Sequence, residues 1–346
     1  MSESYENLTA YMPPLEREGD FEQFWENSLR ELAAGERSTA YQEPGESIFD
    51  WRETDCHYPL PQVRARRVEL TAPDGASLRG LYIHPVWAGP ENPVPGLIRW
   101  HGYSSNHGYI CEILPWALMG YAVLALDVRG QTGDSPDPRR YKTGAYAGWM
   151  TRGLDAPENY YYRLVYLDAV QAAVALSRRP ETDSRLAFFG NSQGAAVSAA
   201  AAALLSRFAS VFPDWPAPSA LGLGTPFLSH LSLALAEQSG GPLDEFSMYF
   251  RMHDPLRRTE KQIRRLLSYF DIMNFAPWIT CPALVSVALR DTACPPRAVF
   301  ALINHLGGRR EVCVYPDYGH ERIDPHLDRL ILFLTEQAPP RSRPAP

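Results

Sequence analysis

Lysine is almost absent from this chain of 346 residues, and positive charge of any kind is in the minority. Lysine occurs only at Lys142 and Lys261, so arginine supplies most of the 33 basic residues, against 40 acidic residues and a net charge of −7. Nucleic acids and anionic membranes attract proteins through cationic surfaces. The acidic balance therefore argues against both as binding partners.

Long hydrophobic runs are also missing. No stretch approaches the roughly 20 consecutive apolar residues that a membrane-spanning helix needs. The opening residues, MSESYENLTAYMPP, lack the basic segment followed by an apolar segment that marks a secretory signal. We therefore expect a cytoplasmic protein that does not bind membranes.

The cysteines do not form pairs in the sequence. Five are scattered along the chain, without CxxC spacing and without clustering with histidine: Cys56, Cys111, Cys281, Cys294 and Cys313. Neither a disulfide framework nor a zinc site is indicated, and free thiols in a reducing compartment are expected. The chain also lacks a phosphate loop and a dinucleotide-binding fingerprint, so we expect no metal and no cofactor.

Short apolar runs alternate with helical patterns along most of the chain. The runs are residues 66–70, 78–83, 96–100, 121–126, 186–189, 283–289 and 311–315, and the main helical patterns are residues 162–176, 194–205 and 296–306. This alternation predicts an α/β fold with a mostly parallel central sheet and helices on both faces. The first two runs flank Pro73-Asp74-Gly75, which predicts an antiparallel hairpin.

The remaining segments suggest additions to this core. Residues 1–60 are predicted to be an N-terminal extension whose helix begins after Asp20 and docks on the main domain. The catalytic domain is expected at residues 61–336. Within it, residues 212–278 interrupt the strand–helix rhythm and are interpreted as a helical cap insertion. The proline-rich residues 337–346 are expected to be a disordered tail.

A Gly-x-Ser-x-Gly pentapeptide, Gly190 to Gly194, follows one predicted strand and opens an alanine-rich helix. At such a sharp strand-to-helix turn the serine is exposed in a strained conformation, and only small residues fit on either side of it. The helix N-terminus directs free N–H groups toward a developing oxyanion. The context favours Ser192 as a nucleophile over a serine that lies by chance in a glycine-flanked helix cap.

A serine nucleophile needs a base and an acid that orients the base. His320 follows the last predicted strand, and Asp291 directly follows the strand before it. The order Ser192, Asp291, His320 is that of the α/β-hydrolase fold. Asp317 and Asp324 are rival acids, but they lie too close to His320 in sequence to come from a different strand. The structural alternative for Asp291 is a helix N-cap.

An oxyanion hole on this fold takes two backbone N–H groups. One belongs to the residue after the nucleophile, which is Gln193, and the other to the loop after an early core strand. That strand ends at Trp100, so Tyr103 is the candidate for the second group. Its alternative is an aromatic side chain that only packs at a turn.

Several segments together resemble the acetyl xylan esterase and cephalosporin C deacetylase family, carbohydrate esterase family seven. The motifs on which the resemblance rests are Arg129-Gly130-Gln131, the Gly190–Gly194 elbow and His320-Glu321. Around them, DVRGQTGDS, RGLDAPENYYYRLVYLDAV, RDTACPPRAVFALINHL, YPDYGHE and the DFEQFW helix are similar to the family, so the resemblance covers about residues 10–335.

The resemblance implies a deacetylase of small acetylated carbohydrates and of cephalosporin C, assembled as a cytoplasmic homohexamer. It also implies that the triad and oxyanion hole are those named above. The residues it expects to brace the site are Arg129, Gly130, Gln131, Gly190, Gly194 and Glu321.

This sequence departs from the family pattern near the elbow. Asn191 stands where glycine is commoner, Ala195-Ala196 replace glycines, and Ile303 occupies a frequently aromatic position. These departures affect the expected acyl pocket rather than the triad. Two other interpretations stay open: a peptidase or longer-chain carboxylesterase of the same fold, and a non-catalytic binding module. The presence of all three triad residues argues against the binding module.

Overall fold

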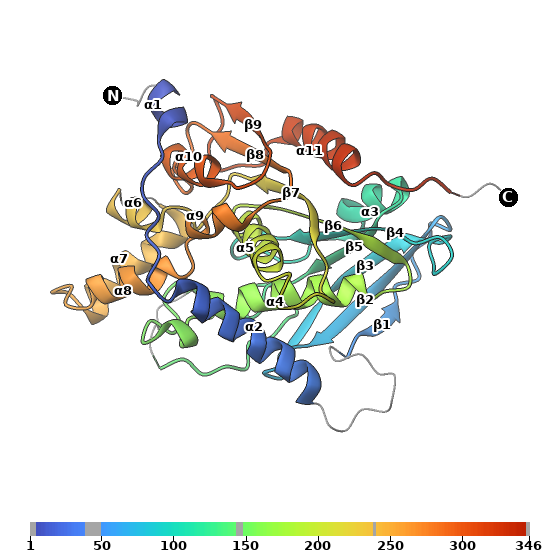
Figure 1. Cartoon of the computed structure of the whole chain (residues 1–346), viewed down its shortest axis with the longest axis horizontal. Coiled ribbons are helices and arrows are strands. Elements are labelled where there is room, and N and C mark those ends of the chain that lie inside the picture. The colour runs from blue at the N-terminus through green and yellow to red at the C-terminus, as the bar shows by residue number, and fades with distance from the viewer. Residues whose placement is uncertain (1–4, 39–49, 143–147, 238–239, 344–346) are drawn as a thin grey trace.

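The computed structural model describes residues 5–38, 50–142, 148–237 and 240–343. Its centre is a nine-stranded sheet with the order β1-β2-β3-β5-β4-β6-β7-β8-β9 (Figure 1). The strands are β1 (Arg52–Asp55), β2 (Val63–Thr71), β3 (Ser77–Pro85), β4 (Val94–Trp100), β5 (Ala122–Leu126), β6 (Thr182–Asn191), β7 (Pro218–Gly224), β8 (Ala283–Ala288) and β9 (Arg310–Tyr315).

The sheet divides into an antiparallel part and a parallel part. Strands β1, β2, β3 and β5 pair antiparallel, and the predicted hairpin is confirmed as β2 and β3. From β5 to β9 every neighbouring pair is parallel. The predicted α/β fold with a mostly parallel sheet is therefore confirmed. The carboxyl ends of the parallel strands lie along one edge, which is where such sheets bind ligands.

Helices cover both faces of the sheet (Figure 1). They are α1 (Tyr5–Ala10), α2 (Phe21–Ser38), α3 (Ile110–Met119), α4 (Tyr161–Ser177), α5 (Gln193–Arg207), α6 (Leu231–Ala236), α7 (Asp244–His253), α8 (Glu260–Ser268), α9 (Ile272–Phe275), α10 (Pro296–His305) and α11 (Asp324–Gln337), with 3₁₀ turns at Pro157–Asn159, Gly241–Leu243 and Ala276–Trp278. Successive strand residues point to opposite faces. Phe188 belongs to the core cluster that includes residues of α2, α4, α5 and α10, and Phe189 belongs to the cluster that includes residues of α3 and α11.

The predicted start of the cap at residues 212–278 is too early in the sequence. Residues Pro218–Gly224 form β7, a central strand between β6 and β8. Its sequence, PSALGLG, lacks the β-branched and aromatic residues that mark strands, so local propensity does not reveal it. Only the helices after β7, from α6 to α9, form an insertion before β8.

Both expected terminal segments join the domain more closely than predicted. Strand β1 lies inside the expected extension of residues 1–60 and pairs with β2. Asp20 accepts the first helical bond of α2 through its carbonyl, while its carboxylate accepts a hydrogen bond from Tyr269. At the other end, Ala338 is buried and its carbonyl accepts a hydrogen bond from the Tyr121 hydroxyl at 2.9 Å, so the expected disordered tail is docked there. Residues 344–346 lie outside the described residues.

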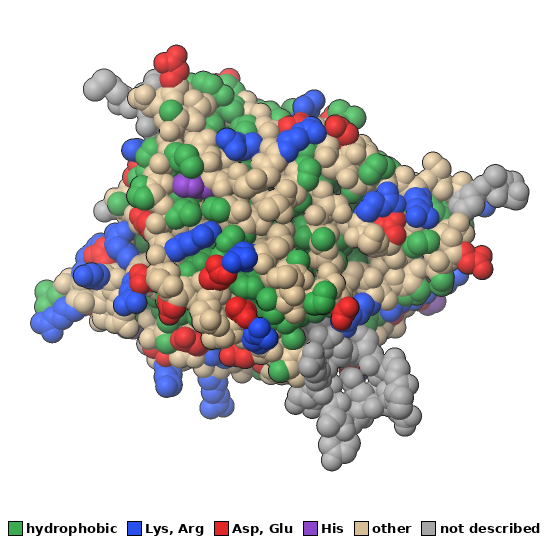
Figure 2. Space-filling model, viewed as in Figure 1, with side chains coloured by type: hydrophobic (Ala, Val, Ile, Leu, Met, Phe, Trp, Pro, Cys, Tyr) green, Lys and Arg blue, Asp and Glu red, His purple; other side chains and the backbone are tan. Residues whose placement is uncertain are grey.

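The surface matches the charge balance of the sequence. Acidic and basic side chains are interspersed over the described part of the face in Figure 2. This agrees with the similar numbers of the two kinds in the sequence, 40 acidic and 33 basic residues. Within the described ranges, no helix combines the length and apolar character needed to cross a bilayer.

His101 fixes the ends of two adjacent strands beneath the site. Its Nε2 accepts a hydrogen bond from Val128 N at 2.8 Å, so the ring proton lies on Nδ1 and is donated to Gly102 O at 2.8 Å. Burial lowers the pKa of His101 to about 4. The ring therefore stays neutral in the folded protein at pH values where an unfolded histidine is charged.

We predict that this histidine makes folding stability depend on pH. Below about pH 6.5 the unfolded chain takes up a proton at His101 that the folded chain does not, until the pH reaches about 4. The free energy of unfolding should therefore fall as the pH falls through this range, with His101 contributing about 1.4 kcal/mol per pH unit. Denaturant unfolding between pH 4.5 and 8 gives the free energy of unfolding as a function of pH. Below pH 6.5 its slope should be smaller in His101→Gln than in the parent, by the contribution of one proton.

Above pH 7 the two stability curves should run parallel, because neither form of the chain then changes protonation at this position. Equal slopes for both proteins below pH 6.5 would contradict the assignment of His101 as a buried neutral group.

Candidate active site

Ser192 lies at the turn between β6 and α5 in a conformation that side chains rarely adopt, with φ 54° and ψ −120°. The turn is possible because glycines lie two residues before and two residues after Ser192. A Cβ on Gly194 would lie 2.1 Å from the Trp100 carbonyl oxygen, and a Cβ on Gly190 would lie 2.4 Å from the carbonyl carbon of Gly194. The Ser192 N–H donates to Gly224 O at 2.8 Å, which ties the turn to β7.

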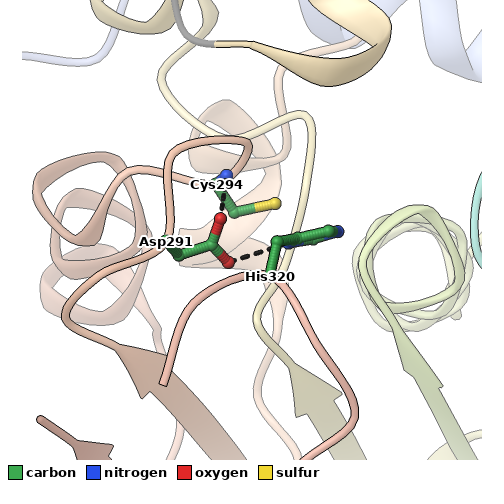
Figure 3. A group of neighbouring side chains, drawn as sticks. All are labelled: Asp291, Cys294 and His320. Carbon is green, nitrogen blue, oxygen red and sulfur yellow. Dashed lines mark hydrogen bonds and ion pairs between the residues drawn. The ribbon is translucent and has the colours of Figure 1, made fainter. Parts of the chain in front are cut away.

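The structure brings Asp291 and His320 to the serine from the loops after β8 and β9. His320 Nε2 lies 3.0 Å from Ser192 Oγ, and His320 Nδ1 lies 2.8 Å from Asp291 Oδ2. Figure 3 shows the carboxylate and the imidazole side by side. The other carboxylate oxygen, Oδ1, accepts hydrogen bonds from Ala293 N at 2.9 Å and Cys294 N at 2.8 Å.

These contacts set the roles that the three groups can play. The Asp291 carboxylate can accept only a proton on Nδ1, which leaves the Nε2 lone pair facing the serine hydroxyl. The Asp291 side chain is fully buried and that of His320 is 34% exposed, so the chain of hydrogen bonds runs from the interior to the solvent side.

The two rival acids are engaged elsewhere. The Asp317 carboxylate accepts a hydrogen bond from Arg290 Nη2 at 2.6 Å, and the Asp324 carboxylate lies 2.6 Å from Arg322 Nε. Both carboxylates are largely exposed. Asp291 is thus the acid that the fold places against His320. Asp291 also acts in part like the helix cap that was its structural alternative, because its Oδ1 accepts hydrogen bonds from two backbone N–H groups just before α10.

Gln131 joins the two segments that carry the expected oxyanion-hole donors. Gln193 is the first residue of α5, so its N–H has no intrahelical acceptor. The Gln131 and Gln193 side chains pair reciprocally, with N–O distances of 2.8 and 3.1 Å. Gln131 Oε1 also accepts from Ser104 N, next to Tyr103, at 3.1 Å. One buried amide therefore fixes both donor segments relative to each other.

Arg129 anchors the turn that carries Gln131. Its guanidinium is buried and donates two hydrogen bonds of 2.6 Å to Asp168 on α4 and one of 2.5 Å to Asp74. Two carboxylates compensate the cost of burying this charge. The Arg129 carbonyl accepts from the Tyr161 hydroxyl at 2.6 Å, and Gly130 takes a φ of +68°. The expected bracing role of this turn thus corresponds to buried contacts.

Glu321 is not brought to the triad. Its side chain is exposed and lines a surface cavity with Arg322 and Arg99, between α3 and α11. Among the contacts of the described residues, none joins Glu321 to Ser192, Asp291 or His320.

Glu245 on α7 is a buried residue at the site that sequence reasoning missed. Its carboxylate accepts hydrogen bonds from the Tyr103 hydroxyl and from Met150 N, the latter at 3.0 Å. The same Tyr103 hydroxyl accepts from Trp149 N at 2.8 Å. Burial raises the pKa of the Glu245 carboxyl. Its segment, DEFSMYF, carries no motif, and only the fold brings it to Tyr103.

The profile of one protein family, described as "Acetyl xylan esterase (AXE1)", matches residues 2–337. The chain belongs to the acetyl xylan esterase family. The expected family resemblance is thereby confirmed.

The names of individual relatives of this acetyl xylan esterase family member agree with the family assignment. An acetyl xylan esterase from Paenibacillus sp. R4 is 37% identical with a TM-score of 0.86, and the match covers 97% of this chain and 100% of that one. Acetyl xylan esterase 1 from Thermoanaerobacterium sp. JW/SL YS485 is 30% identical with a TM-score of 0.86, over 97% and 99% of the two chains. Acetyl esterase Axe7A from Xylanibacter ruminicola is 26% identical over 311 residues. That match covers 87% of this chain, which spans 63% of the length of the curated relative.

We predict graded losses from substitutions in the triad. Ser192→Ala removes one oxygen and should lower kcat by about 10⁶-fold, as nucleophile deletions do in other triads. Asp291→Asn leaves the nucleophile in place but loses control of the tautomer, and should lower kcat by about 10⁴-fold. The measurement is steady-state hydrolysis of p-nitrophenyl acetate by variants whose thermal unfolding matches the parent.

Asp317→Asn is the matched control, because it removes a rival carboxylate of the same chemistry and should leave kcat nearly unchanged. Near-normal activity in Asp291→Asn, or a large loss in Asp317→Asn, would contradict the placement of the acid.

Proposed function

We propose that this protein is a serine esterase that removes acetyl groups from small acetylated carbohydrates, such as acetylated xylo-oligosaccharides, and from cephalosporin C. The observation that carries the proposal is the hydrogen-bonded chain from Ser192 through His320 to Asp291, in a member of the acetyl xylan esterase family. The names of the relatives support the acetyl ester as the substrate class.

In the proposed mechanism Ser192 Oγ attacks the acetyl carbonyl while His320 Nε2 takes the hydroxyl proton. The protonated imidazole is stabilised by the Asp291 carboxylate and gives its proton to the departing sugar oxygen. An acetyl group stays on Ser192 as an ester. Water, deprotonated by His320, then attacks this ester and releases acetate and the free serine.

The backbone N–H groups of Gln193 and Tyr103 are the proposed donors to the oxyanion that forms at each attack. Donors fixed before the reaction stabilise this charge without reorganisation, and a single one contributes about 2.7–4 kcal/mol. The Gln131 amide supports the proposal because it bonds to Gln193 and to the residue after Tyr103.

Acyl selectivity follows from the rigid surroundings of Tyr103. Its ring packs edge-on against Trp149 with centroids 5.3 Å apart, and its hydroxyl is held by Glu245. Of the departures from the family pattern, Ala195, Ala196 and Ile303 are buried in the core, and Asn191 is exposed beside Ser192. We infer a small acyl pocket walled by the Tyr103 loop and the Arg129–Gln131 turn.

We predict that activity falls as the acyl chain lengthens. Forcing a longer chain into a pocket fitted to one methyl group costs about 1–3 kcal/mol, so kcat/KM for p-nitrophenyl butyrate should be about 10–100-fold below that for the acetate. Octanoate should be near background. The measurement is a series of esters at one pH, together with acetate release from acetylated xylo-oligosaccharides, peracetylated glucose and cephalosporin C.

Two alternatives give different outcomes in these assays. A longer-chain carboxylesterase gains about 0.8 kcal/mol for each buried CH₂, so butyrate or octanoate would be cleaved faster than acetate. A peptidase would release amines from peptides. A non-catalytic binding module would show no hydrolysis and no covalent labelling of Ser192 by a fluorophosphonate.

We further propose that the protein works as a homohexamer in the cytoplasm, on the basis of its family resemblance. Light scattering after size-exclusion chromatography should give six times the 38.8 kDa of one chain. A mass of one or two chains at micromolar concentration would contradict the hexamer and leave the esterase proposal standing.

A further inference from the structure

The thiol of Cys294 lies against the triad, and the proposed mechanism does not use it. Cys294 follows Asp291 in the loop between β8 and α10, and it is buried with 4% of its surface exposed. Its sulfur lies within 4.8 Å of a ligand atom of Asp291 and of His320, and its backbone N–H donates to Asp291 Oδ1 at 2.8 Å. Figure 3 shows its sulfur beside the His320 ring.

Three side chains of different types converge here. One ligand atom each from Asp291, Cys294 and His320 lies within 4.8 Å of the other two (Figure 3). Tetrahedral zinc has bonds of about 2.3 Å to sulfur and 2.0–2.2 Å to nitrogen and oxygen, which puts its ligand atoms roughly 3.5 Å apart. The longest of these separations would have to shrink by about 1 Å, and His320 Nδ1 and Asp291 Oδ2, now 2.8 Å apart, would have to move apart slightly to admit the ion. No other group of His, Cys, Asp or Glu residues in the described ranges meets this spacing.

We propose that Asp291, Cys294 and His320 form an inhibitory site for a thiophilic divalent metal ion, such as Zn²⁺ or Cd²⁺. Sulfur and imidazole ligands favour these ions over Mg²⁺ and Ca²⁺, which prefer oxygen ligands. Of the three ligands, His320 has the most exposed side chain, at 34%, so the ion would approach from the side of this ring.

Binding would displace two protons, and the second displacement would switch off the base. The ion takes the Cys294 thiolate, and the thiol proton leaves to solvent. It also takes His320 Nδ1, the nitrogen that lies 2.8 Å from Asp291 Oδ2. The proton on Nδ1 passes through solvent to Nε2, which then cannot accept the Ser192 proton. The inhibitory effect rests on the proposed esterase function, whereas the binding of the ion does not.

The first test is inhibition of p-nitrophenyl acetate hydrolysis by Zn²⁺ and Cd²⁺, with each variant compared with its own metal-free rate. Both ions should inhibit the parent enzyme, EDTA should restore the activity, and Mg²⁺ at the same concentration should have no effect. Cys294→Ala should raise the inhibition constant at least tenfold. The exposed Cys111 provides the matched control, since Cys111→Ala should be inhibited like the parent.

The second test detects the ion without using activity. Cadmium bound to a thiolate gives an ultraviolet charge-transfer band. On titration with Cd²⁺, this band should report one bound ion per chain in the parent, in Cys111→Ala and in the inactive Ser192→Ala. Cys294→Ala should lack this bound ion. If Cys294→Ala does not fold, Cys294→Ser replaces it, because serine has a similar size but no soft sulfur ligand.

Equal inhibition of the parent and the Cys294 variant, or an unchanged cadmium band in that variant, would overturn the metal site. An enzyme that lacks esterase activity but shows the Cys294-dependent band would instead overturn the proposed function and leave the site intact.

Discussion

The close approach of α5 to the end of β4 is the constraint on which the active-site geometry depends. Only hydrogen fits between Gly194 and the Trp100 carbonyl, where a Cβ would lie 2.1 Å from the oxygen. This contact brings the first N–H groups of α5 to the edge where Tyr103 follows β4. It also holds Ser192 at a positive φ of 54°, a strained conformation that costs of order 1–3 kcal/mol and persists only when the surroundings fix it. The buried length of α5, from Gln193 to Leu205, supplies that fixation.

A second layer of polar contacts connects this turn to the rest of the molecule. Arg129 is held by carboxylates from α4 and from the β2–β3 turn, and it orients Gln131 toward Gln193. Arg129, Asp168, Gln131 and Gln193 are buried, so leaving any of them unpaired would cost about 1–3 kcal/mol, which favours this one arrangement. The segments that carry the proposed oxyanion-hole donors are thereby positioned by Arg129 and Gln131.

The triad was predictable from sequence because each member lies in the turn or loop that follows a strand of a parallel sheet. Parallel strands end along the same edge, so Ser192, Asp291 and His320 had to meet there once the strands were recognised. Strand β7 was not recognised, since its glycines carry a weak strand signal although its position between β6 and β8 demands a strand. Glu245 was missed for another reason: its proximity to the site comes from a tertiary contact with Tyr103, and its segment carries no motif. Cys294 lies only three residues after Asp291, but the sequence does not show that its thiol turns toward His320.

Two separate sets of contacts therefore fix the residues of the site, and they have different consequences. The catalytic groups are fixed by strand ends and by backbone N–H groups, as Asp291 is by Ala293 and Cys294. The wall beside them is fixed from outside the sheet, because Tyr103 is bonded to Glu245 on α7. A change in the inserted helices can move this wall without moving Ser192 or His320. Under the proposed function, acyl selectivity would thus depend on the insertion, whereas the hydrolytic chemistry would depend on the sheet.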